Sequence, residues 1–425
     1  MKHSSNRSRI AVASFLACLL GASSADTSAT TITALITVSS TTTTITSTTL
    51  TATANDESNV LVEATGVAYV TAVSFVKTGD SNSDDDSSFT DLNAAVAIQD
   101  YGTIYIYDST ITSDGESANA LHTYETGSYA YLYDLTLDAS GDGSHGIYTA
   151  GGYIYAENLV VTTNGAHGSA IATDQGGGTI VVNTATVNTN GLRSALIYST
   201  GNITVTGLTG TSTVSPAACI DGANFFSIID SAITAGPEEH GVIQIVSTVS
   251  GGEDDIATAK VTGGSLEETR GEYGLIFVGN VVADITLSKV DITIASGIFV
   301  NASNDASWGT SGSNGGTAVI SITETDITGD SYVSSISTLT MDFYSSAYSG
   351  AINAANTGGT ISVYLDSDST WTVTGDSYVD VITDETTDCS NIVSDGYIVY
   401  YDSSSNTWLD GATISLSGGG SLTPS

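Results

Sequence analysis

Short runs of alternating apolar and polar residues recur along this chain at a nearly constant interval. One strand-like run lies at residues 103–108 and returns at 129–134, 153–158, 179–184, 202–207 and 225–230. A second run, at residues 328–333, is repeated identically at 374–379, which is close to twice the spacing of the first run. Internal repetition at such a period is typical of a solenoid.

Each period holds about three alternating runs separated by Gly, Asn, Asp or Ser, the pattern that strands and turns require. No segment shows a convincing helical period. The sequence therefore predicts an all-β fold, a right-handed parallel β-helix with coils of about 23–26 residues. We expect about 14–15 such coils between residues 58 and 418.

The alternation also predicts which side chains point into the helix, because successive side chains of a strand face opposite sides. The first inward column consists of Ile104, Ala130, Ile154, Ile180, Ile203 and Phe226. The next consists of Ile106, Leu132, Ala156, Val182, Val205 and Ile228. A second strand of each coil contributes Leu121, Ile147, Ile171, Leu196 and Cys219. Cys219 is therefore predicted to be a buried core thiol.

Segment 1–25 has the composition of a secretory signal. Three basic residues within the first nine positions precede an apolar stretch, and small residues follow at 23–25. The apolar stretch is too short to span a bilayer, so we expect secretion to the cell exterior or surface without membrane insertion. The Ser/Thr-rich segment 26–57 is predicted to be an N-terminal cap or a solvated stalk, and residues 419–425 a polar tail.

The charge balance is strongly acidic, with 46 Asp and Glu against 8 Lys and Arg and a net charge of −38. Removal of segment 1–25 leaves only five basic residues, namely Lys77, Arg193, Lys260, Arg270 and Lys289. Such a chain cannot form the basic stripe of a nucleic-acid-binding protein. Its hydrophobic content of 40% excludes a disordered acidic tail.

Two cysteines, Cys219 and Cys389, follow the predicted signal. About seven coils separate them, which is on the order of 30 Å along a stack with a rise of about 4.8 Å per coil. A disulfide requires Cα atoms within about 7 Å of each other. We therefore predict two unpaired thiols.

Several segments together resemble a family of secreted, adhesin-like repeat proteins with the parallel β-helix of pectin lyases. The resemblance covers roughly residues 70–385. It rests on the ordered succession of residues 77–80, 84–86, 93–96, 176–179, 196–200, 219–222, 308–309 and 312–316. It implies an exported β-helix with a surface or matrix role and no established catalytic residues.

Two enzyme classes of this fold serve as alternatives. The dipeptides His145-Gly146, His167-Gly168 and His240-Gly241 are similar to part of the polygalacturonase motif, but their recurrence near strand starts indicates a feature of the repeat. A polysaccharide lyase needs a basic residue beside carboxylates that hold Ca²⁺, and Arg193 is the best-placed base. No catalytic residue is predicted, and a glycoside hydrolase or lyase is the alternative.

Acidic clusters occur at residues 84–86, 253–255 and 237–240. Their oxygen ligands suit Ca²⁺, but their spacing matches no known calcium loop, so solvated loop charge is the preferred interpretation. We predict no metal site and no cofactor.

Tyrosine supplies the most informative candidate site, because ten of the 21 tyrosines lie between residues 101 and 155. The alternation places Tyr105, Tyr131 and Tyr155 in one outward column and Tyr107 and Tyr133 in another. Such columns either stabilise the sheet through cross-strand pairs or bind a ligand, a sugar ring or a protein surface. Trp308, in a Gly/Ser-rich loop, is a second candidate contact.

Asn202 and Asn301 begin N-glycosylation sequons. The sequence as a whole predicts a secreted, non-enzymatic adhesive or matrix protein that binds an extracellular polysaccharide or a surface protein. A secreted effector that binds a host protein is a further alternative.

Overall fold

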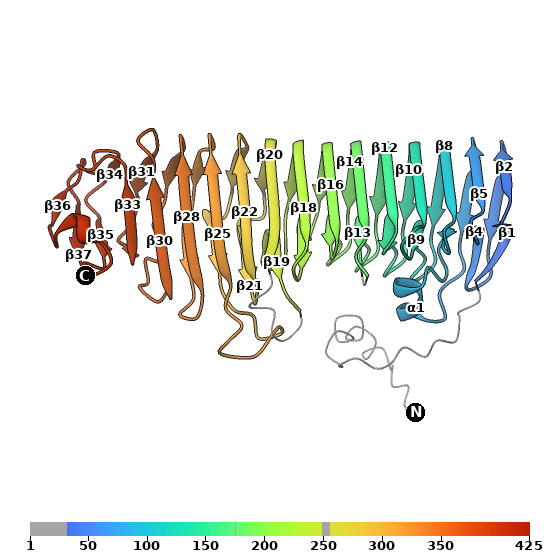
Figure 1. Ribbon diagram of the computed structural model, residues 1–425, viewed down its shortest axis with the longest axis horizontal. Coiled ribbons are helices and arrows are strands. Elements are labelled where there is room, and N and C mark those ends of the chain that lie inside the picture. The colour runs from blue at the N-terminus through green and yellow to red at the C-terminus, as the bar shows by residue number, and fades with distance from the viewer. Residues whose placement is uncertain (1–31, 175, 249–255) are drawn as a thin grey trace, which may run out of the picture.

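The computed structural model describes residues 32–174, 176–248 and 256–425, and in these residues the chain forms an all-β solenoid. About 15 parallel coils are stacked along one axis, with 56% of residues in strands and 2% in helices. Figure 1 shows the resulting rod, in which the N-terminal and C-terminal coils lie at opposite ends. The predicted parallel β-helix is confirmed. The predicted signal (1–25) and the acidic cluster at 253–255 lie outside the described residues.

One strand from each of twelve successive coils joins a 12-stranded parallel sheet, here called sheet A. Its strands in order are β1 (Thr33–Ser39), β4 (Glu57–Glu63), β7 (Val96–Ile98), β9 (Leu121–Tyr124), β11 (Ile147–Ala150), β13 (Ile171–Thr173), β15 (Ile197–Ser199), β17 (Ala218–Asp221), β19 (Gly241–Val246), β21 (Gly274–Gly279), β24 (Ile298–Ala302) and β27 (Asp330–Val333).

Most other strands of these coils, together with two strands of the following coils, form sheet B, which turns a corner and so covers two sides of the solenoid. Its N-terminal strands are β2 (Thr42–Thr46), β3 (Thr49–Ala52), β5 (Val67–Thr71), β6 (Ser74–Lys77), β8 (Thr103–Ser113), β10 (Tyr129–Ala139), β12 (Tyr153–Thr163), β14 (Thr179–Thr189) and β16 (Asn202–Ser212). Its other strands are β18 (Phe225–Ala235), β20 (Ile256–Glu268), β22 (Val282–Ser288), β23 (Asp291–Ile294), β25 (Thr317–Thr323), β28 (Thr338–Tyr344), β30 (Thr360–Leu365) and β33 (Val381–Asp384).

Two smaller sheets complete the C-terminal coils. One contains β26 (Ile327–Thr328), β29 (Ala347–Ser349), β31 (Thr370–Val373) and β34 (Ile392–Ser394). The other contains β32 (Ser377–Val379), β35 (Ile398–Tyr401), β37 (Ser421–Pro424) and β36 (Ile414–Ser415), with the short 3-10 helix η3 (Thr407–Leu409) between β35 and β36.

Sheet B turns its corner at the last residue of the repeated strand-like run, such as residue 108 in the run 103–108. There the backbone adopts a left-handed conformation, with φ between 46° and 67°, and two successive side chains face outward. The residues at this position are Asp108, Asp134, Asn158, Thr184, Gly207 and Asp230. Asp, Asn and Gly tolerate this conformation best, which explains why the run usually ends in one of them.

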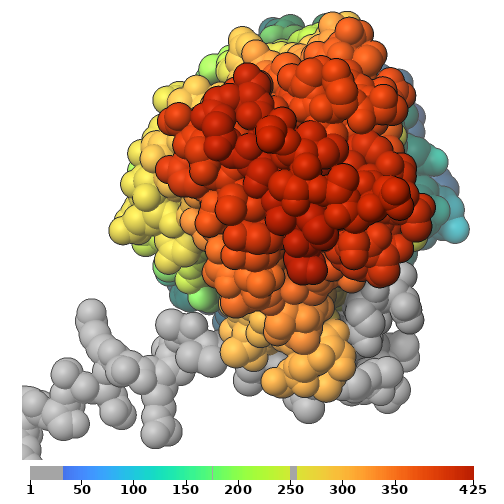
Figure 2. Space-filling model, turned by 90° about the vertical axis from the view of Figure 1, so that its left-hand side faces the viewer, coloured from blue at the N-terminus to red at the C-terminus, as the bar shows by residue number. Residues whose placement is uncertain are grey.

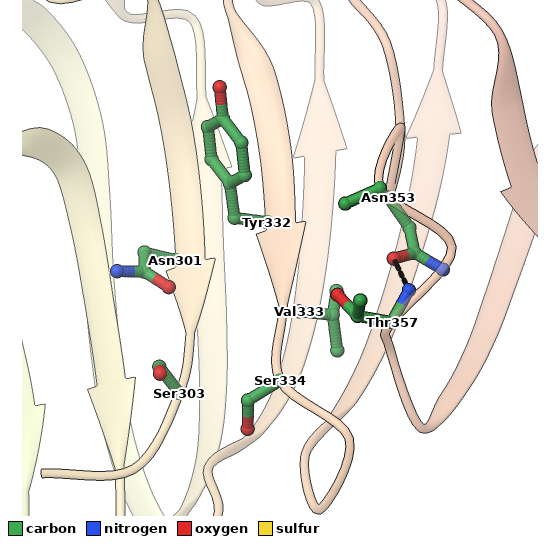
Figure 3. Close-up of a pocket in the computed structure, with 8 residues that line it drawn as sticks. Asn301, Ser303, Tyr332, Val333, Ser334, Asn353 and Thr357 are labelled. Atoms are coloured by element: carbon green, nitrogen blue, oxygen red, sulfur yellow. Dashed lines mark hydrogen bonds between the residues drawn. The ribbon is translucent and has the colours of Figure 1, made fainter.

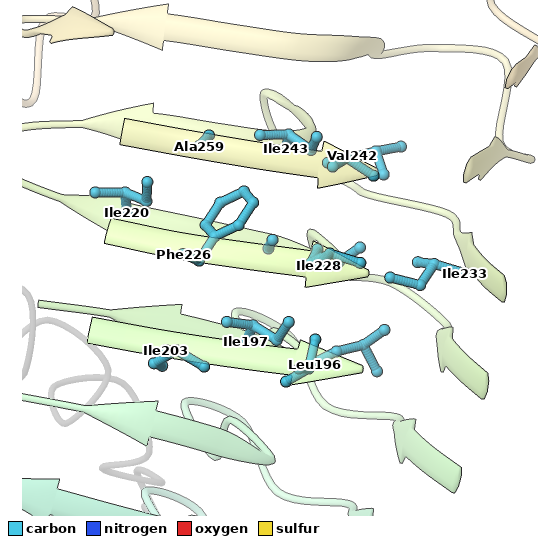
Figure 4. Packing of buried hydrophobic residues seen from close by; sticks show 14 of the residues in the cluster. Leu196, Ile197, Ile203, Ile220, Phe226, Ile228, Ile233, Val242, Ile243 and Ala259 are labelled. Carbon is cyan, nitrogen blue, oxygen red and sulfur yellow. The ribbon is translucent and has the colours of Figure 1, made fainter. Parts of the chain in front are cut away.

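The core consists of the predicted inward columns. Ile104, Ala130 and Ile154 pair in register, and every residue of the first two predicted columns is at most 1% exposed. Figure 4 shows how sheet B residues such as Phe226 pack against sheet A residues such as Ile220 across the interior.

In the third predicted column, Leu121, Ile147 and Ile171 pair in register, and Leu196 is buried in the core as predicted but lies one position before the true partner Ile197. Ile171 pairs with Ile197 and then Ala218, not with Leu196 and Cys219. The coil between Ile197 and Ala218 is shorter than its neighbours, and an error of a single position in register reverses the face. Cys219 therefore points out of sheet A, although only 7% of it is exposed.

Both predicted domain boundaries differ from the limits of the solenoid. β1, β2 and β3 form a regular coil whose strands pair in parallel with β4, β5 and β6, so the β-helix begins well before residue 58. At the other end, β37 pairs with β35, so residues 421–424 belong to the fold rather than to a tail.

A short helix, α1 (Asp84–Phe89), is inserted between β6 and β7 and lies over the outer face of sheet A. Ser83 caps its first turn by accepting a hydrogen bond from the Asp86 backbone N at 3.2 Å. The carbonyl oxygen of Ser88 accepts a hydrogen bond from the Tyr148 hydroxyl at 2.9 Å. The helix thereby closes this face of sheet A over β9 and β11.

A truncation in the core should destabilise the protein far more than one on the same strand's outer side. We expect Ile154→Ala, at a fully buried position, to lower the free energy of unfolding by about 2–4 kcal/mol. Val160→Ala, 43% exposed on the same strand β12, should cost less than about 0.5 kcal/mol. Guanidinium unfolding measures both, and equal losses would contradict the inward assignment.

The two thiols should be unreactive until the protein unfolds, because Cys219 and Cys389 are free and buried. Burial raises the pKa of both thiols, that of Cys389 to about 12, which removes the reactive thiolate at neutral pH. In protein that lacks segment 1–25, maleimide labelling followed by mass spectrometry should find no adduct in the native state. Two adducts should form in denaturant, with or without reductant.

Candidate ligand-binding surface

Eight tyrosines form one continuous surface on the outer face of sheet B, across β5, β8, β10 and β12. We call this surface the tyrosine platform. Its members are Tyr69, Tyr105, Tyr107, Tyr129, Tyr131, Tyr133, Tyr153 and Tyr155. They all lie on the first half of their strands, before the corner, so every ring projects from the same flat side of the solenoid.

Coil stacking sets the geometry of the platform. Ring centroids are 5.0 Å apart for Tyr69 and Tyr105, and 4.9 Å apart for Tyr105 and Tyr131, with interplanar angles of 9° and 11°. Tyr107 and Tyr133 stack in the same way at 5.0 Å and 7°. These distances match the spacing of about 4.8 Å between strands, so parallel pairing alone brings the rings into contact.

The stack ends at β12, where the rings tilt. Tyr153 meets Tyr131 at 6.2 Å and 52°, and Tyr155 meets Tyr133 at 5.9 Å and 50°. Tyr155 is the backbone partner of Tyr131, as predicted, but its hydroxyl donates to Glu157 and accepts a hydrogen bond from Asn183. The stacked column therefore runs through Tyr69, Tyr105 and Tyr131, and Tyr155 lies beside it.

Tyr69 was not among the predicted site residues, although it extends the stack by one coil. Helix α1 is inserted between the strands that carry Tyr69 and Tyr105. The sequence separation of these two partners therefore exceeds the usual repeat by about half a coil. The local alternation of residues 67–70 was the one available signal. Tyr69 is also the most exposed ring of the column, at 42%.

The platform offers hydroxyl groups as well as ring surface. Among the described residues, the hydroxyls of Tyr105, Tyr107, Tyr131 and Tyr133 have no hydrogen-bond partner. Burial and the neighbouring tyrosines raise the pKa of Tyr131 and Tyr133, which keeps these phenols neutral. The platform can therefore donate and accept hydrogen bonds beside an apolar ring surface.

The rim of the platform is acidic. The corner residues Asp108 and Asp134 are exposed directly after Tyr107 and Tyr133, and Glu157 on β12 is the register partner of Tyr133. The basic side chains that form ion pairs lie elsewhere, because Arg193, Arg270 and Lys289 pair with Glu239, Glu238 and Glu324. A negative rim disfavours acidic ligands.

Trp308 does not form a second contact surface. It is buried, at 7% exposed, and packs with Val246 and Phe277. Its ring also lies 4.8 Å from the ring of His240, whose Nε2 is 3.1 Å from an Asp305 carboxylate oxygen. This contact anchors the loop against the side of the solenoid, and it leaves the indole no free face for a ligand.

The three His-Gly pairs play separate structural roles. His145 stacks on Tyr148 at 4.5 Å and accepts a hydrogen bond from the Ser169 backbone N at 3.0 Å; burial lowers its pKa to about 4. His167 occupies a left-handed turn position with φ of 58°. His240 contacts Asp305, as described above.

Arg193, the best-placed candidate base, is already engaged. Both carboxylate oxygens of Glu239 accept hydrogen bonds from its guanidinium, at 3.0 and 3.1 Å. Together with the structural roles of the histidines, this pairing gives the enzyme alternatives no support.

The acidic clusters also serve local structure. Residues 84–86 form the first turn of α1, where Asp84 accepts a hydrogen bond from the Ser117 hydroxyl at 2.6 Å. Glu238 and Glu239 pair with Arg270 and Arg193. Within residues 32–174, 176–248 and 256–425, no group of three or more His, Cys, Asp or Glu side chains is placed to hold a metal ion.

The two sequon asparagines lie in different environments. Asn202 is exposed at the start of β16. Asn301 is partly buried on β24, with its side chain on the outer face of sheet A and Tyr332 as its partner in β27. Both asparagines stay candidate glycosylation sites.

Comparisons with protein-family models, with curated proteins and with solved structures return no match. In the described part of the chain, none of the helices has the length and apolar character needed to cross a membrane.

A buried carboxyl group near α1 escaped the sequence reasoning. Asp91 is 0% exposed, and neither of its carboxyl oxygens has a hydrogen-bond partner among the described residues. Burial, followed by the charges of Glu125 and Glu63, raises its pKa well above the ordinary value. A charge in this position destabilises the folded state.

Asp91→Asn should therefore stabilise the protein increasingly as the pH rises. When folding raises the pKa of a carboxyl group, the group's contribution to stability is fully present below its pKa in the unfolded state. This contribution is lost as the pH rises through its pKa in the folded state. We expect the variant to gain about 1–3 kcal/mol at pH 8 and little at pH 4. Urea unfolding across this range tests it, with the exposed Asp114→Asn as control. A pH-independent difference would contradict the assignment.

Proposed function

We propose that this protein is a secreted, non-enzymatic β-solenoid with an adhesive or matrix role, and that its tyrosine platform binds a neutral extracellular polysaccharide. The observation that carries the proposal is the platform itself, where four successive coils present aromatic rings and unpartnered hydroxyls on one flat side. The resemblance to secreted adhesin-like β-helix proteins and the signal-like segment 1–25 support the location.

The chemistry of the platform favours sugars over other ligands. Aromatic surface packs against the apolar face of a pyranose ring, and phenolic hydroxyls hydrogen-bond to sugar hydroxyls. The acidic rim at Asp108, Asp134 and Glu157 favours an uncharged polysaccharide over pectin or alginate. A polymer also suits a surface that repeats at each coil, because several weak contacts along one chain add up in avidity.

The test replaces the centre of the platform. We expect Tyr105→Ser together with Tyr131→Ser to weaken binding to a neutral polysaccharide by at least about tenfold, since both rings of the central stack are lost. Pull-down on insoluble β-glucan, chitin and mannan measures this loss, with pectin and alginate as acidic comparisons. Soluble sugar released during the same incubation reports any enzymatic activity.

A matched control exists on the same side of sheet B. Tyr364 occupies the same outward column as Tyr105, and Tyr344 the column of Tyr107, with the ring centroids of Tyr344 and Tyr364 5.4 Å apart. The pair Tyr344→Ser and Tyr364→Ser should leave binding unchanged. Product release, or equal loss of binding in both pairs, would overturn the proposal. A protein ligand with no glycan binding would favour the effector alternative.

A further inference from the structure

A pocket of about 210 Å³ opens on the outer face of sheet A, far along the rod from the tyrosine platform. It lies where β24, β27 and the loop after Asn353 meet, as Figure 3 shows. Figure 2 shows the rod from its C-terminal end. The pocket lies nearer to this end than the tyrosine platform does. The lining residues are Asn301, Ser303, Tyr332, Val333, Ser334, Asn353, Ala355 and Thr357.

The lining carries no charge. Two amides, three aliphatic hydroxyls, one phenol and two apolar side chains surround the pocket. The full chain has 46 acidic residues and a net charge of −38, so an uncharged pocket is a distinct feature of its surface. An anionic ligand would find no cation among these lining residues, and a cationic ligand no carboxylate.

Hydrogen bonds fix the loop that forms one side of the pocket, while other lining side chains have free polar groups. The Asn353 side-chain oxygen accepts hydrogen bonds from the backbone N of Thr357 at 3.0 Å and of Gly358 at 2.9 Å, which fixes the loop. Among the described residues, the side chains of Asn301, Tyr332 and Thr357 make no hydrogen bond. Tyr332 is also 43% exposed.

We propose that this pocket binds one neutral hexopyranose unit. A partly exposed ring, a free amide and free hydroxyls around a pocket of this size form a set that packs against a sugar ring and hydrogen-bonds to its hydroxyls. Phosphate or uronate recognition would require Lys or Arg, and a lipid tail would require an apolar lining. The inference does not depend on the tyrosine platform, which lies on sheet B.

The pocket also bears on the sequon at Asn301. Asn301 and Tyr332 are register partners on adjacent strands, so a glycan attached to Asn301 would itself occupy the pocket. The proposal therefore requires an unmodified Asn301. Mass spectrometry of the protein from its natural source should find this asparagine without a glycan.

Saturation-transfer NMR tests the pocket on the full chain produced in a bacterial host without N-glycosylation. The probes are the methyl glycosides of glucose, galactose and mannose, with methyl glucuronide as the charged comparison. We expect a signal from at least one neutral glycoside and none from the glucuronide. Tyr332→Ala and Asn301→Ala should each weaken binding by about tenfold or more.

Tyr397→Ala is the matched control, because Tyr397 is 39% exposed and lies outside the pocket. It should leave the signal unchanged. The pocket variants are compared in a chain that also carries Tyr105→Ser and Tyr131→Ser, so that sugar bound at the tyrosine platform does not contribute to the signal. Thermal unfolding confirms that each variant is folded. No signal from any neutral glycoside, or a signal that persists in both pocket variants, would overturn the proposal. A signal that disappears when Tyr105→Ser and Tyr131→Ser are introduced, before any pocket substitution, would assign the sugar to the platform instead.

Discussion

Parallel hydrogen bonding between successive coils is the constraint on which the rest of this structure depends. Each strand pairs with the strand one coil away, so a residue's nearest neighbour across the sheet is about two dozen positions distant in sequence. Side chains then form columns along the axis. Inward columns become the core, and outward columns bring like residues to the strand spacing of about 4.8 Å. The stacked rings of the tyrosine platform are a direct consequence.

The sequence predicted what the repeat controls and failed where coil length varies. The alternation of apolar and polar residues within the repeated run was enough to predict the buried column that contains Ile154. It was also enough to predict the outward stack of Tyr105 on Tyr131. Turns have no fixed length, however, so Cys219 was assigned to the wrong face and Tyr69 was missed. The contacts that bury Trp308, and the pocket near Tyr332, join loops to strands of other coils, and no periodic signal reports such contacts.

Four of the five basic residues that follow segment 1–25 form hydrogen bonds or ion pairs within the fold, and the fifth, Lys260, lies exposed in an outward column. Lys77 is fully buried, and its ammonium donates hydrogen bonds to the carbonyl oxygens of Gly79 at 2.6 Å and Ala54 at 3.1 Å. Arg193, Arg270 and Lys289 are held in ion pairs. Acids outnumber bases so strongly that most of them cannot be paired in this way, and the protein carries a large negative charge. Against that background, the tyrosine platform presents neutral aromatic and hydroxyl groups, and for this reason an uncharged ligand is proposed for it.

The outward columns show how one solenoid carries different chemistries at different points along its axis. The column that contains Tyr69, Tyr105 and Tyr131 continues through Tyr155 and Val181 to Thr204, Ser227 and Lys260, while the inward columns beside it stay apolar and buried. A coil's contribution to stability comes from its buried residues and its pairing with neighbouring coils, so the exposed position is free to vary. In the proposed function, ligand binding is confined to the coils whose outward residues suit it. The platform on sheet B and the pocket on sheet A lie on separate faces of one rod, an arrangement that suits the proposed adhesive role.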